Sequence, residues 1–311
     1  MTPCTVIQHT LWIGNNFPGI FSLPNLVNVS SIYIGDAFYD DQTQSIAPGT
    51  LSGVNFPALQ KTSEILAVNL GSLSSIDIPN LVDGSFITLT GLPALTNFTL
   101  NSNYADGYVN ITNTGITEFS YDGPSLSDVT LVGNPSLAKV TISDESAISS
   151  IDVDCGGMVQ SRNSFGSKYT HHAAQHQMPR FSGPKKVTRF KVSYCKQPSG
   201  DWKTALAGIG SIKSYSLKFH DNEFISLSVP DLKNASSIEI EKNHNLTEIQ
   251  FPSLKTADAL TINDNSDLLY INATSFPALT SLGSLSRFDG PFRAQVVSHI
   301  QFSTLKRLTK F

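Results

Sequence analysis

The segment between Ser214 and Gly283 repeats one short pattern three times. In each copy, alternating apolar residues end three residues before an Asn, and a Pro-x-Leu triplet follows. The three Asn residues, Asn222, Asn243 and Asn265, are separated by 21 and 22 residues. A period of about 20 to 30 residues is typical of solenoids, whose repeats are each too small to bury a core alone. The pattern therefore predicts a stack of rungs.

The alternation of residue types within one rung indicates a half-buried strand. Ile238 and Ile240 alternate with Glu239 and Glu241, which sends the isoleucines inward and the glutamates to solvent. In stacked rungs the Asn side chains would lie roughly 4.8 Å apart and could bond to each other and to the turning backbone. The alternative is that each Asn lies in a separate surface turn. The predicted column comprises Asn103, Asn134, Asn222, Asn243 and Asn265.

Proline marks the corners of the rungs. It lacks a donor and has a fixed φ, so it suits a corner and is excluded from a central strand. Nine of the 16 prolines begin a Pro-x-Leu triplet, which extends the repeat over most of the chain. These triplets begin at Pro24, Pro57, Pro79, Pro93, Pro124, Pro135, Pro230, Pro252 and Pro277.

The fold predicted from this repeat is all-β: a parallel β-helix-like solenoid in a single elongated domain with a disordered-looking insertion. Four segments are expected. Residues 1–154 form the N-terminal part of the solenoid, 155–205 a basic irregular insertion, 206–290 the C-terminal part of the same solenoid, and 291–311 an irregular basic tail.

Charge sets the insertion apart. Residues 1–154 contain two basic and fourteen acidic residues, whereas residues 155–203 contain nine basic residues and one acid. The insertion has few aliphatic residues, which argues against a packed core there. Such a loop could bind phosphomannan, anionic lipid or nucleic acid, but it lacks the interleaved aromatic residues of a nucleic-acid groove. A solvated basic loop is the preferred interpretation, and no nucleic-acid partner is expected.

Two cysteine residues flank the insertion, and three histidine residues lie within it. Cys155 and Cys195 flank it, and a disulfide between them would close a loop of about 40 residues and contribute roughly 4 kcal/mol. With Cys4 left over, three unpaired thiols are the alternative. His171, His172 and His176 have no acidic neighbour that could orient a ligand, so neither a metal site nor a cofactor is expected.

Parallel β-helices also include polysaccharide hydrolases and lyases, which need converging carboxylates. On neighbouring rungs the outward positions read Lys218, Glu239 and Thr261, with His220, Glu241 and Asn263 beside them. This pattern gives one carboxylate for each column, so no catalytic residue is assigned. Lys218 and Glu239 are instead expected to form an ion pair that helps to fix the register.

Several phrases of the repeat resemble a known family. FPALQKTSEI, IPNLVDGSFITLTGLPALTNFTL, VNITNTGITEF, VPDLKNASSIEI and FPSLKTADALTINDN are similar to the fungal GPI-anchored cell-wall organisation proteins of the sporulation-specific type. These proteins carry receptor L-domain, leucine-rich-like repeats. The similarity covers roughly residues 21–154 and 207–285.

The resemblance implies a non-enzymatic, extracellular protein that contributes to the organisation and integrity of a fungal cell wall, with wall polysaccharide or other wall proteins as partners. The alternatives are a polysaccharide-active β-helix enzyme and a ligand-binding ectodomain. The N-terminus lacks the pattern of a signal peptide, and the C-terminus is basic where a lipid-anchor signal is apolar. Membrane attachment is expected only through a lipid anchor, which this chain does not encode visibly.

Sequons for N-glycosylation occur six times, and about four would be expected by chance in a chain this rich in Asn, Ser and Thr. They therefore do not establish secretion, but they are candidate sites in a secreted protein. The acceptor residues are Asn28, Asn97, Asn110, Asn234, Asn245 and Asn272.

Overall fold

The computed structural model is built from β-strands, and its described residues contain no helix. The described residues are 4–35, 49–100, 103–143, 146–156, 158–160, 169–171, 176–183, 186–196, 206–268, 270–271, 274–288, 299–300 and 305–310. The chain divides into two compact units, Met1–Thr141 and Ile142–Phe311. Stacked parallel strands form a β-solenoid, and the predicted parallel β-helix-like fold is thereby confirmed.

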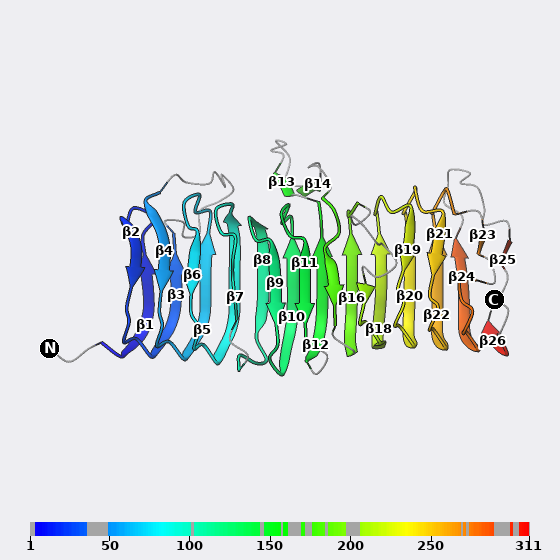
Figure 1. Cartoon of the computed structure of the whole chain (residues 1–311), viewed down its shortest axis with the longest axis horizontal. Coiled ribbons are helices and arrows are strands. Elements are labelled where there is room, and N and C mark those ends of the chain that lie inside the picture. Colours follow the sequence, from blue (N-terminus) through cyan, green and yellow to red (C-terminus); the bar gives the residue numbers. More distant parts are fainter. Residues whose placement is uncertain are drawn as a thin grey trace. The chain divides into compact units, whose positions relative to one another are not determined.

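The main sheet of the first unit has the strand order β1-β3-β5-β7-β8-β10, and each neighbouring pair is parallel (Figure 1). A second parallel sheet contains three shorter strands, and β9 pairs with β11. The main strands are β1 (Val6–Ile13), β3 (Asn28–Ile34), β5 (Lys61–Val68), β7 (Asp83–Leu92), β8 (Tyr108–Thr114) and β10 (Ser125–Val132). The shorter strands are β2 (Gly19–Ser22), β4 (Leu51–Asn55), β6 (Ser75–Asp77), β9 (Glu118–Tyr121) and β11 (Lys139–Ile142).

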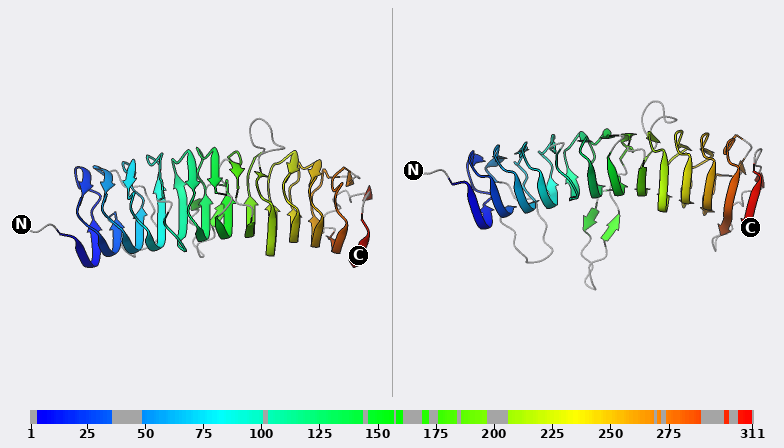
Figure 2. Two further views of the ribbon diagram at one scale, coloured as in Figure 1. Left: turned by 60° about the horizontal axis from the view of Figure 1, so that its bottom comes forward. Right: turned by 90° about the horizontal axis from the view of Figure 1, so that it is seen from below.

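The main sheet of the second unit has the order β12-β16-β18-β20-β22-β24-β26 and is also parallel. Its strands are β12 (Ala147–Asp154), β16 (Lys186–Ser193), β18 (Ser211–His220), β20 (Asn234–Glu241), β22 (Thr256–Asn263), β24 (Ser281–Phe288) and β26 (Arg307–Lys310). The shorter parallel pairs are β15 (Arg180–Ser182) with β17 (Leu206–Ala207), β19 (Ser226–Ser228) with β21 (Glu248–Gln250), and β23 (Tyr270–Ile271) with β25 (His299–Ile300). Strands β13 (Met158–Gln160) and β14 (Tyr169–His171) are antiparallel and lie apart from the main strands (Figure 2).

Inward side chains fix the register of these strands. Ile238, Leu260 and Leu285 are partners on three successive strands, and all three are buried. Ile240 and Ile262 form the next inward row. Because side chains alternate between the two faces of a strand, a slip of one residue would turn such a row outward to solvent. Burial of the core therefore selects one alignment of the rungs.

Most Pro-x-Leu triplets form tight corners that drive an apolar side chain into the core, whereas the triplet at Pro124 runs directly into β10. In the corner at Pro57, the backbone N–H of Leu59 donates to the carbonyl of Phe56 at 3.1 Å. Proline thus occupies the second position of a four-residue turn, where its fixed φ is the one required. The leucine of all nine triplets is buried: Leu26, Leu59, Leu81, Leu95, Leu126, Leu137, Leu232, Leu254 and Leu279.

A left-handed residue bends the chain after many main strands. Asp221, Lys242 and Asp264 have φ values of 55°, 54° and 55°, and Gly133 has a φ of 61°. A left-handed residue with a side chain costs roughly 1–2 kcal/mol, which glycine avoids. Each of the four directly precedes a buried Asn, so the bend aims the amide inward.

Part of the predicted insertion is regular solenoid, and this corrects the prediction for 155–205. Strand β16 pairs in parallel with β12 and with β18, and its Phe190 and Val192 are fully buried. Its inward apolar residues alternate with Thr188, Arg189 and Lys191, and this basic composition concealed a strand pattern. The predicted tail, 291–311, likewise contains β26, which pairs with β24.

Two buried tyrosines should make the first unit sensitive to alkali. Burial raises the pKa of Tyr121 to about 12 and raises that of Tyr104 above its usual value. Because unfolded tyrosines ionise near pH 10, the free energy of unfolding should fall as the pH rises above about 10. Denaturant titrations between pH 9 and 11.5 should show this fall, with a weaker dependence for Tyr121→Phe. If the free energy of unfolding depended equally on pH in the wild type and in Tyr121→Phe, the raised pKa of Tyr121 would not be its cause.

Candidate functional site

Three Asn side chains form a ladder inside the second unit. The Oδ1 atom of Asn243 accepts hydrogen bonds from the backbone N–H of Asn222 at 3.0 Å and from its Nδ2 at 2.9 Å. Asn265 Oδ1 accepts the same pair of bonds from Asn243, at 2.9 and 3.0 Å. Each of these Asn residues is at most 6% exposed. Equivalent amides therefore lie on successive rungs and bond to one another.

The same amides hold the backbone of the bends. Asn243 Nδ2 donates to the carbonyls of Phe219 and Glu241, at 3.1 and 3.0 Å. Burial of an amide without partners would cost several kcal/mol, and these bonds remove that cost. The ladder is therefore a structural element of the fold, with its polar atoms directed into the molecule.

The other two predicted members of the Asn column, Asn134 and Asn103, differ from each other in burial. Asn134 is buried in the first unit, where its Oδ1 accepts hydrogen bonds from Thr114 N and Oγ1 at 2.9 and 2.8 Å. Asn103 was predicted for the column but is exposed, which corrects that prediction. Asn103 lies three residues after a leucine, as the predicted spacing requires, but it belongs to a turn and not to a strand. Spacing alone therefore does not identify a member of the column. Thr114, the last residue of β8, is the buried polar residue on the neighbouring rung.

A disulfide continues the line of the ladder. The backbone N–H of Cys195 donates to Asn222 Oδ1 at 2.9 Å, and Cys195 is bonded to Cys155. Both cysteines are buried, whereas Cys4 is a free, exposed thiol. Because β16 brings its rung directly beside β12, the two residues that flank the predicted insertion lie on adjacent rungs.

In the part of the chain that the structure describes, no group of three or more His, Cys, Asp or Glu residues could hold a metal ion. His172 lies outside the described residues, and His171 is described only as part of β14. Burial, followed by the charge of Lys196, lowers the pKa of His176 below its usual value.

The candidate glycosylation residues differ in exposure. Asn97, Asn234 and Asn245 are exposed, whereas Asn28 and Asn110 are partly buried at the outer sheet face. Asn110 Oδ1 accepts a hydrogen bond from Thr112 at 2.8 Å, and Asn234 Oδ1 accepts one from Thr256 at 2.8 Å. Asn272 lies outside the described residues.

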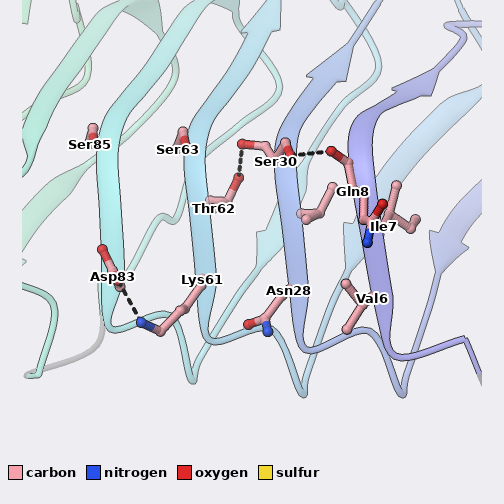
Figure 3. Close-up of a pocket in the computed structure, with 11 residues that line it drawn as sticks. Val6, Ile7, Gln8, Asn28, Ser30, Lys61, Thr62, Ser63, Asp83 and Ser85 are labelled. Atoms are coloured by element: carbon pink, nitrogen blue, oxygen red, sulfur yellow. Dashed lines mark hydrogen bonds and ion pairs between the residues drawn. The ribbon is translucent and has the colours of Figure 1, made fainter.

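The first unit has a depression of about 450 Å³ across the early parts of β1, β3, β5 and β7 (Figure 3). Its lining is mainly neutral and polar, including Ser30, Ser63 and Ser85. Lys61 Nζ forms an ion pair with Asp83 Oδ2 at 2.9 Å at one end. A single carboxylate held by a lysine does not provide an acid and base pair, so this depression suits binding of a polar ligand.

The second unit has a charged depression of about 440 Å³ on the outer face of its main sheet. In register across four strands lie Asp152, Lys191, Lys218 and Glu239. Each lysine pairs with the neighbouring carboxylate: Lys191 with Asp152 at 3.5 Å, and Lys218 with Glu239 as predicted.

The adjacent column contains Asp154, Ser193, His220 and Glu241.

This arrangement corrects the expected single carboxylate in each column. Asp152 and Asp154 join the columns of Glu239 and Glu241 because β16, absent from the predicted stack, connects β12 with β18. Three strand spacings still separate the two carboxylates in each column, which is about 14 Å. That distance exceeds the roughly 5–9.5 Å between the carboxyl groups of glycosidases.

A tyrosine and a histidine surround one aspartate at the rim of the charged depression. Burial raises the pKa of Tyr194, and Asp221, which accepts a hydrogen bond from Tyr194, raises it further. His220 Nδ1 lies 2.6 Å from Asp221 Oδ2. Asp221 is therefore engaged by two neighbours and serves to order the bend after β18.

No protein-family model, curated protein or solved structure matches this chain. Within the described residues, no helix is long and apolar enough to cross a membrane.

The ladder predicts a large effect of a small substitution. Asn243→Ala removes bonds to both neighbouring amides and removes one donor each from the carbonyls of Phe219 and Glu241. The free energy of unfolding should fall by about 2–4 kcal/mol, as measured by urea denaturation. The exposed Asn245→Ala is the matched control and should change stability by less than about 0.5 kcal/mol. Equal effects of the two substitutions would contradict a structural role for the ladder.

Proposed function

We propose that this protein is an exported, non-enzymatic cell-wall protein of the fungal type, which contributes to wall organisation by binding polysaccharide or other wall proteins. The observation that carries the export is the disulfide between Cys155 and Cys195. Disulfides persist in oxidising compartments and are rare in the cytosol. Exposed sequons at Asn97, Asn234 and Asn245 are compatible with glycosylation during export.

The outer faces of the two main sheets support the binding role. Their outward positions repeat on every rung, as with Glu239 and Thr261 on β20 and β22. A repeated polymer is well matched by a repeated surface, because each rung offers an equivalent position to the next unit of the ligand. Ion pairing of Asp152 and Glu239 with lysines argues for a structural use of these carboxylates.

One specific observation favours a second candidate, a polysaccharide-active β-helix enzyme. Glu239 and Glu241 are two residues apart on β20, both line the charged depression, and such positions are about 7 Å apart along a strand. That separation is within the range of inverting glycosidases. A cleaving enzyme should release reducing ends from polysaccharide, and Glu239→Gln with Glu241→Gln should abolish that release.

The binding proposal is tested by sedimentation of the secreted full chain with particulate β-glucan and with chitin. The expected result is retention of the protein in the pellet, with no reducing ends released over hours. Failure to bind either polysaccharide or an extract of wall proteins would contradict the proposal. Release of reducing ends that depends on Glu239 and Glu241 would favour the enzyme instead.

Export through an oxidising compartment predicts a stability contribution from the disulfide. Reduction of the bond between Cys155 and Cys195 should lower the free energy of unfolding by roughly 4 kcal/mol for a loop of about 40 residues. The measurement compares urea unfolding with and without a reductant, and Cys4→Ser serves as the control that should not differ from the parent. Detection of free thiols at both positions in secreted protein would contradict the disulfide on which the proposed export rests.

A further inference from the structure

Four aromatic side chains face solvent on the main sheet of the first unit. Trp12, Phe86 and Tyr108 are 50%, 48% and 43% exposed, and Tyr33 lies beside Trp12. We call these four residues the aromatic ledge. Large aromatic side chains gain stability from burial, so their exposure together on one face indicates a binding surface.

The register places the aromatic ledge in two pairs. Trp12 and Tyr33 are partners on β1 and β3, with ring centroids 5.1 Å apart and an edge-to-face angle of 89°. Phe86 and Tyr108 are partners on β7 and β8, and their rings stack at 5.0 Å and 16°. Between the pairs, β5 contributes Glu64, whose Oε2 accepts a hydrogen bond from the Tyr33 hydroxyl at 2.7 Å. A carboxylate thus lies between two aromatic surfaces.

A row of serines adjoins the aromatic ledge. Ser30, Ser63 and Ser85 line the depression of the first unit, and Figure 3 shows them side by side on β3, β5 and β7. Each directly precedes a residue of the row Ser31, Glu64 and Phe86. Small hydroxyls therefore lie next to the aromatic rings on the same strands. The combined surface has flat apolar faces with hydrogen-bonding groups beside them.

We infer that the aromatic ledge and the serine row form a binding site for a neutral, β-linked chain of pyranose sugars. This inference rests on the proposed function and names the ligand class for one face. A pyranose ring has apolar C–H faces that can stack on aromatic rings, and hydroxyls at its rim that suit Ser and Glu. The 450 Å³ depression provides space for the part of the chain beside the ledge.

Spacing supports a chain that runs across the strands. Adjacent strands are roughly 4.8 Å apart, so β3 and β7 are about 10 Å apart. One sugar residue of an extended β-linked chain has nearly the length of one strand spacing. The two aromatic pairs are also offset by two residues along the strands, about 7 Å, because the register partner of Tyr33 on β7 is Thr88 rather than Phe86. A chain stacked on both pairs would therefore cross the strands obliquely, with a joining sugar over Glu64 and Leu66 of β5.

The acidic residues around the aromatic ledge favour a neutral ligand. Around the ledge, Glu64 and Asp128 are acidic, and Asp128 is the register partner of Tyr108. Lys61, the basic residue that lines the depression, is paired with Asp83. Residues 1–154 contain fourteen acids and two basic residues, so a uronate or phosphate polymer would be repelled.

The polar residues that lie between and beside the aromatic pairs also favour a sugar over a second copy of the chain as the ligand. Protein interfaces are depleted of charge at their apolar core. Here Glu64 separates the aromatic pairs, and Thr88 and Asn110 follow on β7 and β8. Dimerisation through this face is the competing outcome of the test.

The test titrates the full chain with hexasaccharides of β-1,3-glucan and of chitin, with isothermal calorimetry as the readout. Trp12→Ala and Phe86→Ala should each weaken binding roughly 5- to 100-fold, since loss of one stacking contact has that effect on other planar ligands. Phe86→Trp should retain binding. Ile20→Ala is the matched control, because Ile20 is 60% exposed in the same unit but lies on β2, outside the main sheet.

The outcomes separate this inference from the proposed function. Binding of either hexasaccharide that weakens in Trp12→Ala and Phe86→Ala, with unchanged thermal unfolding, supports the inference, and the preferred hexasaccharide identifies the linkage. Retention of wild-type protein on particulate polysaccharide together with unaltered retention of both variants would overturn the inference and leave the proposed function intact. A concentration-dependent dimer that Trp12→Ala abolishes would also overturn it. Absence of binding by the wild type to both forms of polysaccharide would overturn the inference, and the proposed function would fall with it if an extract of wall proteins is not bound either.

Discussion

The fold depends on hydrogen bonds between equivalent groups on successive rungs. Parallel strands supply the backbone part of this pattern, and the buried amides of Asn222, Asn243 and Asn265 extend it to side chains. Each amide bonds to its neighbour and to a carbonyl near the end of the preceding main strand, so the buried amides of this column are satisfied. This constraint requires rungs of nearly equal length and explains the spacing of 21 and 22 residues.

Once the rungs are aligned, each outward position becomes a row. In the second unit the rows bring together charges of opposite sign, and in the first they bring together aromatic rings and serines. Neither arrangement requires side chains to converge into a deep pocket. A stack of rungs is therefore suited to long ligands that contact several strands, and this is the physical basis of the proposed wall function.

Features local to one rung could be predicted from the sequence. The corner prolines and the inward isoleucines are encoded within a few residues, and the stacked Asn residues occur in three regular copies. The strand β16 was missed because Arg189 and Lys191 made its segment look like a solvated loop, although Phe190 and Val192 alternate with them. Asn103 was selected by spacing alone, which does not distinguish a buried bend from an exposed turn.

The outer faces were less predictable. Which outward residues meet depends on the register between rungs of unequal length, as in the first unit, where Tyr33 and its partner Leu66 are 33 positions apart but Phe86 and Tyr108 are 22 apart. The aromatic ledge therefore emerges only after alignment. The useful sequence signal was an aromatic residue at an outward position in several strands, namely Trp12, Tyr33, Phe86 and Tyr108.

The most direct test of in-register stacking is disulfide formation between engineered cysteines on neighbouring rungs. Thr261 and Ser286 are register partners, and parallel neighbours lie roughly 4.8 Å apart, within the range that a disulfide can bridge. Thr261→Cys with Ser286→Cys, in a Cys4→Ser background, should close on mild oxidation. Thr261→Cys with Ser284→Cys, about 8 Å apart, should remain reduced. Equal closure of both pairs, or closure of the second pair alone, would contradict the stacked rungs.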